Sequence, residues 1–135
     1  MRSAAVLCLL ALAVTGCGAA PKDSTKQFKG EQQKVAAVVE QIEKAARDDK
    51  PEVVCGKLLS AALLARIKQA GTNCRTGAKE AFADADSFDL TVKAVKITGD
   101  KATATVTSGT GSQKKTDALE LARDGAVWKV DALRQ

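Results

Sequence analysis

The sequence contains no histidine and no tyrosine. Without histidine, serine–histidine–acid and cysteine–histidine catalysis are excluded, because both use an imidazole as the general base. Zinc sites that combine cysteine with histidine are excluded for the same reason. A general base active near neutral pH would have to be a carboxylate whose pKa is raised by burial.

Aromatic residues are also scarce, at 3% of the chain with a single tryptophan. The core must therefore be built from alanine, valine, leucine and isoleucine, which bury less area per residue than aromatic side chains do. A small domain with such a core gains from a covalent cross-link. The 135 residues are 45% hydrophobic and 27% charged, which suits one globular domain rather than two.

The formal charge is +5, and it becomes +4 without residues 1–16, which hold Arg2 and no acidic residue. Acidic and basic residues are interleaved along the chain. A mildly basic domain is attracted to an anionic membrane or wall polymer. No pattern of aromatic and basic residues accompanies the charge, so we expect no nucleic-acid partner.

The N-terminus has the features of an export signal. Arg2 precedes an apolar stretch, Ala4–Val14, that is too short to span a bilayer core, which needs about 20 residues. The stretch ends in Val14-Thr15-Gly16-Cys17, which resembles a lipobox. We therefore predict a lipoprotein signal peptide over residues 1–16 and a lipidated tether over residues 17–24.

The lipobox has a chemical logic. The peptidase subsite next to the cut accepts small side chains such as Gly16, and the thiol of Cys17 takes up a diacylglyceryl group. Two acyl chains give stable anchoring where one is marginal. We expect the protein on the extracytoplasmic face of the cell membrane, with the membrane as its partner through Cys17. The alternatives are an ordinary secretory signal with a chance cysteine, or an uncleaved anchor.

Two of the four cysteines remain for the mature domain. Cys8 leaves with the signal peptide and Cys17 carries lipid, which leaves Cys55 and Cys74 in an oxidising compartment. A redox pair would show the Cys-x-x-Cys spacing, and a zinc site would need four ligands. We predict a structural disulfide between Cys55 and Cys74.

Helical periodicity dominates the first half of the mature chain. Four helices are predicted, over Thr25–Arg47, Pro51–Leu59, Ala61–Ala70 and Arg75–Ala83. Ser24 is expected to cap the first, with Gln27 completing a capping box. Ser60 is expected to cap the third helix, and Gly71 to end it.

From Phe88 onward the hydrophobic period is two, which is typical of strands. Strands are predicted over Phe88–Ile97, Ala102–Thr107, Lys114–Arg123 and Ala126–Leu133. One extra residue near Lys93-Ala94 indicates a β-bulge, and Asp124-Gly125 indicates a hairpin turn. Four antiparallel strands in a meander after the helices predict an α+β domain.

Three segments, in their order along the chain, carry a family resemblance. They are Cys55-Gly56-Lys57-Leu58-Leu59 with the later Cys74, the strand pair Val95–Ala102, and Asp124–Asp131 followed by Leu133. Together they resemble the small bacterial lipoproteins of the nuclear-transport-factor-2-like (NTF2-like) superfamily, over residues 25–135.

The resemblance implies a cone: a curved four-stranded antiparallel meander wrapped against the N-terminal helices, with a cavity between them. A cystatin-like arrangement, with one helix gripped by the meander, is the competing architecture. The extra helices between Pro51 and Ala83 favour the cone.

Enzymes of the cone fold use aspartate, histidine and tyrosine in the cavity, and this sequence has only the aspartates. The candidates for a buried base are Asp48, Asp49, Asp84, Asp86 and Asp89. A simpler role for these residues is to cap helix ends or to face solvent. Asp84-Ala85-Asp86 lacks the third ligand and the central glycine of a calcium loop, and no Gly-Lys-Ser/Thr motif of a phosphate loop follows Gly109–Ser112. We expect no cofactor, no metal and no enzymatic activity.

Ile67, Phe82, Phe88 and Trp128 could line a pocket for an apolar ligand, or they could be the core itself. The expected function is a lipid-anchored, non-enzymatic extracytoplasmic domain that binds a small apolar ligand or a protein partner at the cell envelope. The alternatives are an inhibitor or immunity-type protein of an exported enzyme, and a cone-fold isomerase or dehydratase that uses a buried aspartate.

Overall fold

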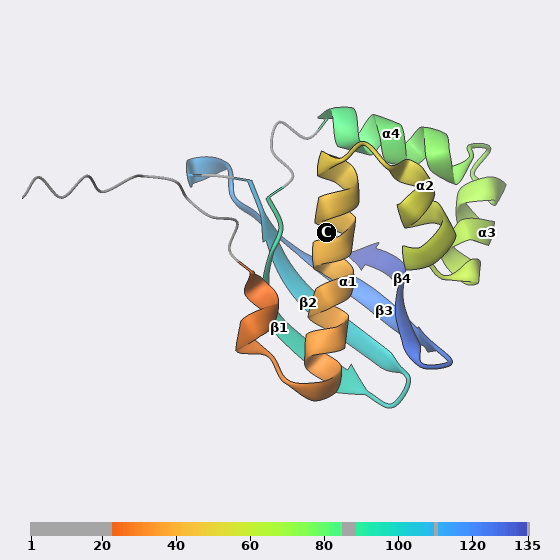
Figure 1. The fold of residues 1–135 in the computed structure, drawn as a ribbon. Coiled ribbons are helices and arrows are strands. Elements are labelled where there is room, and N and C mark those ends of the chain that lie inside the picture. Colours follow the sequence, from red (N-terminus) through yellow and green to blue (C-terminus); the bar gives the residue numbers. More distant parts are fainter. Residues whose placement is uncertain (1–22, 85–88, 110, 135) are drawn as a thin grey trace, which may run out of the picture.

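The computed structural model describes residues 23–84, 89–109 and 111–134 (Figure 1). The expected lipobox, Asp86 and Phe88 lie outside these ranges. The helices are α1 (Gly30–Arg47), α2 (Pro51–Val53), α3 (Ala61–Gln69) and α4 (Cys74–Asp84), and the strands are β1 (Thr91–Thr98), β2 (Lys101–Ser108), β3 (Lys115–Asp124) and β4 (Val127–Arg134). The α+β prediction is confirmed.

The four strands form one antiparallel sheet in the order β1-β2-β3-β4. In β1, Lys93 is the extra residue between the pairs that Val92 and Ala94 make with β2, so the predicted bulge is confirmed. A second bulge was not predicted. In β4, Asp131 is skipped between Val130 and Ala132. Because a bulge redirects the side chain that it contains, Asp131 leaves the regular alternation of the strand.

Helix α1 lies across one face of the sheet, and α3 contacts β4, with α2 and α4 beside it (Figure 1). Val35 and Val39 of α1 are fully buried, as are Val92 of β1 and Leu121 of β3. The core is aliphatic apart from Trp128, as the composition requires. Within the described ranges, no helix is long and apolar enough to cross a membrane.

The N-terminal helix differs from the expectation. Residues Ser24–Gln27 form a separate 3-10 turn, capped by Asp23 rather than by Ser24, and α1 begins only at Gly30. Gly30 has a φ of 58°, which glycine adopts without strain. The capping box between Ser24 and Gln27 was wrong because both side chains are used in tertiary contacts with β1 instead.

Cys55 and Cys74 form a disulfide with their Cα atoms 5.8 Å apart, which confirms the predicted pairing. Cys55 lies in a π-helical turn over Val54–Leu58, and Cys74 begins α4. The chain between them carries α3, which has no fully buried residue. Links at its two ends, rather than deep packing, therefore hold α3 in place.

Removal of the disulfide by the double substitution Cys55→Ser/Cys74→Ser should lower the free energy of unfolding by about 3 kcal/mol, because the unfolded chain regains the freedom of the closed loop. Urea denaturation of the full chain, oxidised and reduced, measures the loss. Reduction of the wild type should reproduce the effect of the double variant. Free thiols at Cys55 and Cys74 in the unreduced, unfolded wild type, located by thiol labelling and peptide mass spectrometry, would contradict the pairing.

Candidate functional site

A surface hollow of 390 Å³ lies along one side of α1. Six of its seven lining residues have polar or charged side chains, with charges of both signs, and apolar atoms of these residues make up most of the lining surface. The lining residues are Asp23, Ala37, Glu40, Gln41, Glu43, Lys44 and Arg47. All except Asp23 belong to α1, whose period of 3.6 residues brings them to one side of the helix. Sequence reasoning missed this site because helical periodicity assigned these residues to the solvated surface.

Asp23 reaches the hollow because the segment before α1 is fastened to the domain. The backbone N–H of Thr25 donates to Oε1 of Glu40 at 3.1 Å, and the hydroxyl of Ser24 donates to the same oxygen at 3.4 Å. The side-chain amide of Gln27 donates to the carbonyl of Val92 in β1 at 2.6 Å. The N–H of Val92 donates to the Ser24 hydroxyl at 3.4 Å. The segment Asp23–Gln27 is thus bound to both α1 and the edge of β1.

The buried carboxylate of the hollow is Glu43, which is 7% exposed. Burial raises the pKa of Glu43, and the guanidinium of Arg47, 2.8 Å away, opposes that rise. The charges of Asp89 and Glu40 add to the rise. The sequence offered five aspartates as candidates for a raised pKa, whereas the structure shows the rise on glutamates of α1.

Burial also raises the pKa of Glu40, and the neighbouring Asp23 adds to this because the two carboxyl groups face each other. The pKa of Asp23 is lowered instead, chiefly by the hydrogen bond from the Thr25 side chain. The carboxyl groups of Asp23 and Glu40 therefore lie together at one end of the hollow, and the pKa of Glu40 is raised while that of Asp23 is lowered.

The three candidate aspartates whose side chains the structure describes do not form a buried site. Asp48 is 2.9 Å from Lys44, and this contact lowers the pKa of Asp48, which makes its carboxylate a weaker base. Asp49 and Asp89 are exposed. The side chain of Asp84 and all of Asp86 lie outside the described residues.

The four residues expected to line an apolar pocket have different surroundings. Trp128 is 3% exposed and belongs to the core, and Phe82 packs against that core. Ile67 is half-buried on α3 and lies outside the core cluster. Phe88 falls outside the described residues. Trp128 and Phe82 therefore contribute to the packing of the domain, which was one of the two roles considered for them.

The edge of Trp128 is fixed by polar contacts with the start of α1. Its indole N–H donates to Oε2 of Glu31 at 2.9 Å. The Arg123 guanidinium donates to the same oxygen at 3.0 Å and lies 4.7 Å from the centroid of the Trp128 ring, in a cation–π contact. These contacts join the β3–β4 hairpin to α1. The indole N–H of Trp128 already donates to Glu31.

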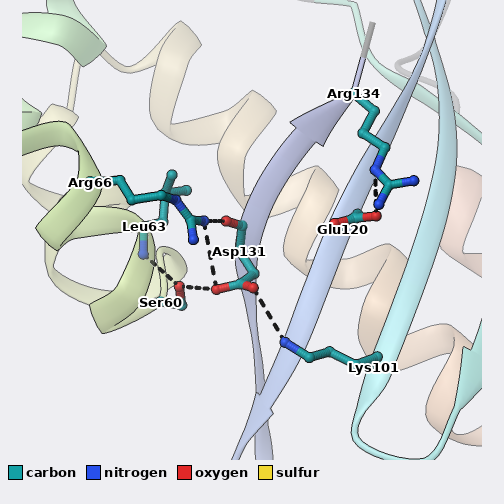
Figure 2. A network of polar contacts seen from close by, with 7 residues as sticks. All are labelled: Ser60, Leu63, Arg66, Lys101, Glu120, Asp131 and Arg134. Atoms are coloured by element: carbon teal, nitrogen blue, oxygen red, sulfur yellow. Dashed lines mark hydrogen bonds and ion pairs between the residues drawn. The ribbon is translucent and has the colours of Figure 1, made fainter. Parts of the chain in front are cut away.

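A second polar network closes the free edge of β4 (Figure 2). The hydroxyl of Ser60 donates to Oδ1 of Asp131 at 2.6 Å and accepts from the N–H of Leu63 at 3.0 Å, so Ser60 caps α3 as predicted. Lys101 lies 3.3 Å from the other carboxylate oxygen, and Arg66 donates to the Asp131 carbonyl.

This arrangement is structural rather than catalytic. The Ser60 hydrogen bond is the largest cause of the lowered pKa of Asp131, so this carboxylate is a poor base near neutral pH. The N–H of Ser60 also donates to the Val130 carbonyl at 2.8 Å. Because unpaired edge groups invite further strands, the network protects β4 while it holds α3.

In the part of the chain that the structure describes, no three carboxylate or cysteine side chains are grouped so as to hold a metal ion. The hollow along α1 remains as a concave site with charges of both signs. Such a site can bind a small polar ligand by ion pairs and hydrogen bonds.

No protein-family model and no curated protein matches the chain. Among solved structures, it is similar to a de novo designed NTF2 fold protein, NT-9. The TM-score is 0.55 at 16% sequence identity, and the match covers 80% of this chain and 87% of that one. The likeness confirms the NTF2-like arrangement of the fold over the cystatin-like alternative. Since both enzymes and non-enzymes have this fold, it assigns no activity.

Asp131→Asn should lower the free energy of unfolding at pH 7 by about 1–2 kcal/mol, because Ser60 and Lys101 lose a charged partner. The pKa of Asp131 is lowered from 3.8 in the folded state, so its stabilisation is complete above that value and is lost as the pH falls through the lowered pKa. Thermal unfolding from pH 7 to pH 2 should show the two proteins converging below about pH 4.

The matched control is Glu120→Gln, which breaks the ion pair with Arg134 seen beside the network (Figure 2). Arg134 is 73% exposed, so the pair should contribute less than about 1 kcal/mol. An equal loss in the two variants would argue against a special role for Asp131.

Proposed function

We propose that this protein is a lipid-anchored extracytoplasmic domain that binds a component of the cell envelope without catalysing a reaction. The observation that supports this best is the attachment of Asp23–Gln27 to α1 and β1. In the proposed mature protein this segment connects the lipidated Cys17 to the folded domain. A domain that works at the membrane surface needs such a connection, because a loose segment would let the domain drift away from the bilayer.

The proposed tether is short. Asp23 is the sixth residue after Cys17, and a fully extended chain of that length spans at most about 20 Å. Because hydrogen bonds to Glu40 and Val92 fix Thr25 and Gln27 to the domain, the residues after Asp23 do not lengthen this tether. The lipid would therefore keep the surface around Asp23 and α1 close to the headgroups of the membrane.

Binding fits the described side chains better than catalysis does. Glu43, which is the buried carboxylate of the hollow, is paired with Arg47. Glu40 accepts two hydrogen bonds from the segment before α1. A general base needs a free lone pair aimed at its substrate, and these contacts already occupy one oxygen of each carboxylate.

The position of Trp128 and Phe82 in or against the core favours binding at the surface over binding of an apolar ligand inside the cone. The partner would then be recognised by exposed polar groups. The net charge of the proposed mature chain, +4, agrees with an anionic group on the partner at the envelope.

The anchor is tested by growing cells with an alkyne-labelled fatty acid. The wild type should carry the label, whereas Cys17→Ser should not, because the acyl chains need the thiol of Cys17. Cys8→Ser, a change within the expected signal peptide, serves as the matched control and should be labelled like the wild type. Label on the Cys17→Ser protein would rule out this form of anchoring.

A further inference from the structure

We propose that the hollow along α1 binds a zwitterion that carries a primary ammonium and a phosphate joined by a short bridge, of the phosphoethanolamine class. This inference deepens the proposed function, on which its membrane source rests, by naming the chemistry that the anchored domain recognises. It is carried by the distribution of charge along the hollow and by the position of Asp23 in its wall.

The acidic end of the hollow suits an ammonium. The carboxyl groups of Asp23 and Glu40 face each other there. Ser24 and Thr25 both donate to Oε1 of Glu40, which leaves Oε2 as the oxygen that can accept from a ligand. A primary ammonium has three donors, and it would bridge the two carboxylates and relieve their mutual repulsion.

The opposite end suits a phosphate. Lys44 and Arg47 follow Glu40 along the same side of α1, one turn and about two turns further on. Lys44 pairs with Asp48 at 2.9 Å and Arg47 pairs with Glu43 at 2.8 Å. The Lys44 side chain is 73% exposed and that of Arg47 is 49% exposed. The Lys44–Asp48 pair is exposed and contributes little, so a phosphate can take over donors of Lys44. Arg47 keeps its pairing with the buried Glu43 and offers the remaining N–H groups of its guanidinium.

The spacing of the two ends fits one small molecule. Four residues separate Glu40 from Lys44, which is a rise of about 6 Å along the helix. Flexible lysine and glutamate side chains can close on a ligand whose two charges are joined by an ethylene bridge. A simple cation would leave Lys44 and Arg47 unused, and a simple anion would meet the carboxylates of Asp23 and Glu40.

The proposed anchor supplies a reason for this chemistry. Asp23 lines the hollow and lies about 20 Å of chain or less from Cys17. The headgroups around the lipid anchor are therefore within reach of the site. A soluble molecule with the same two groups would be bound by the same contacts.

The test uses the full chain purified in detergent and titrated with O-phosphoethanolamine, with the amide resonances of Gln41 and Lys44 as reporters. Saturable shifts are expected. Ethanolamine alone and inorganic phosphate alone should each bind at least tenfold more weakly, because each engages one end of the hollow. No saturable binding, or equal binding of ethanolamine alone, would overturn the inference.

Two substitutions examine the two ends separately. Glu40→Gln and Lys44→Gln should each weaken binding of O-phosphoethanolamine at least tenfold. Lys68→Gln, which removes an exposed lysine on α3 away from the hollow, is the matched control and should bind like the wild type. An unchanged amide spectrum elsewhere in the domain shows that a variant is folded. If Glu40→Gln and Lys44→Gln both bind O-phosphoethanolamine as tightly as the wild type, the proposed site is wrong.

Vesicles distinguish the two sources of the ligand. If vesicles that contain phosphatidylethanolamine displace the soluble probe and phosphatidylglycerol vesicles do not, the hollow recognises the lipid headgroup. If neither displaces it, the site takes a soluble phospho-amine. Failure of the probe to bind an acylated protein refutes this inference alone. If the wild type made in cells carries no lipid on Cys17 but still binds the probe, the anchor is refuted and this inference stands.

Discussion

The packing of α1 against the sheet is the contact on which the rest of the molecule depends. Val35 and Val39 are fully buried against a sheet whose own fully buried residues include Val92 and Leu121. These are aliphatic side chains of modest area, so the contact must be close to be stable. Because one side of α1 is used up in this way, its other side is left to form the hollow, and its first turn reaches the edge of Trp128 through Glu31.

Polar contacts complete what a core with few aromatic residues cannot hold alone. At the β1 edge, Ser24 and Gln27 bind the backbone of Val92, and at the β4 edge, Ser60 binds the backbone of Val130. Each contact does two things, since it protects a strand edge and fastens a peripheral segment. The segment before α1 and the disulfide-bound helix α3 are both held in this manner, so order at the periphery depends on a few hydrogen bonds.

The elements of the fold could be predicted from the sequence to within a few residues, because hydrophobic period, capping residues and turn residues are local. Ser60 capped α3 and Lys93 formed the bulge as predicted. The failures were contacts between distant segments. Ser24 had the chemistry of an N-cap, but its hydroxyl serves Glu40 and Val92, which are 16 and 68 residues away. The bulge at Asp131 was not predicted, because the hydrophobic alternation in the sequence of β4 does not indicate an extra residue there.

The sequence by itself determined the type of core, the absence of imidazole chemistry and the cysteine pair available for a disulfide, since each follows from which residues are present. Only the tertiary structure decided which carboxylate is buried. Glu43 has the same local pattern as any surface glutamate of a helix, and its pKa rises chiefly because neighbouring segments remove water from it. In the same way, Asp23 became part of a hollow with Lys44 and Arg47 because hydrogen bonds fold its segment back onto α1. Burial and proximity belong to the folded chain, and no local pattern specifies them.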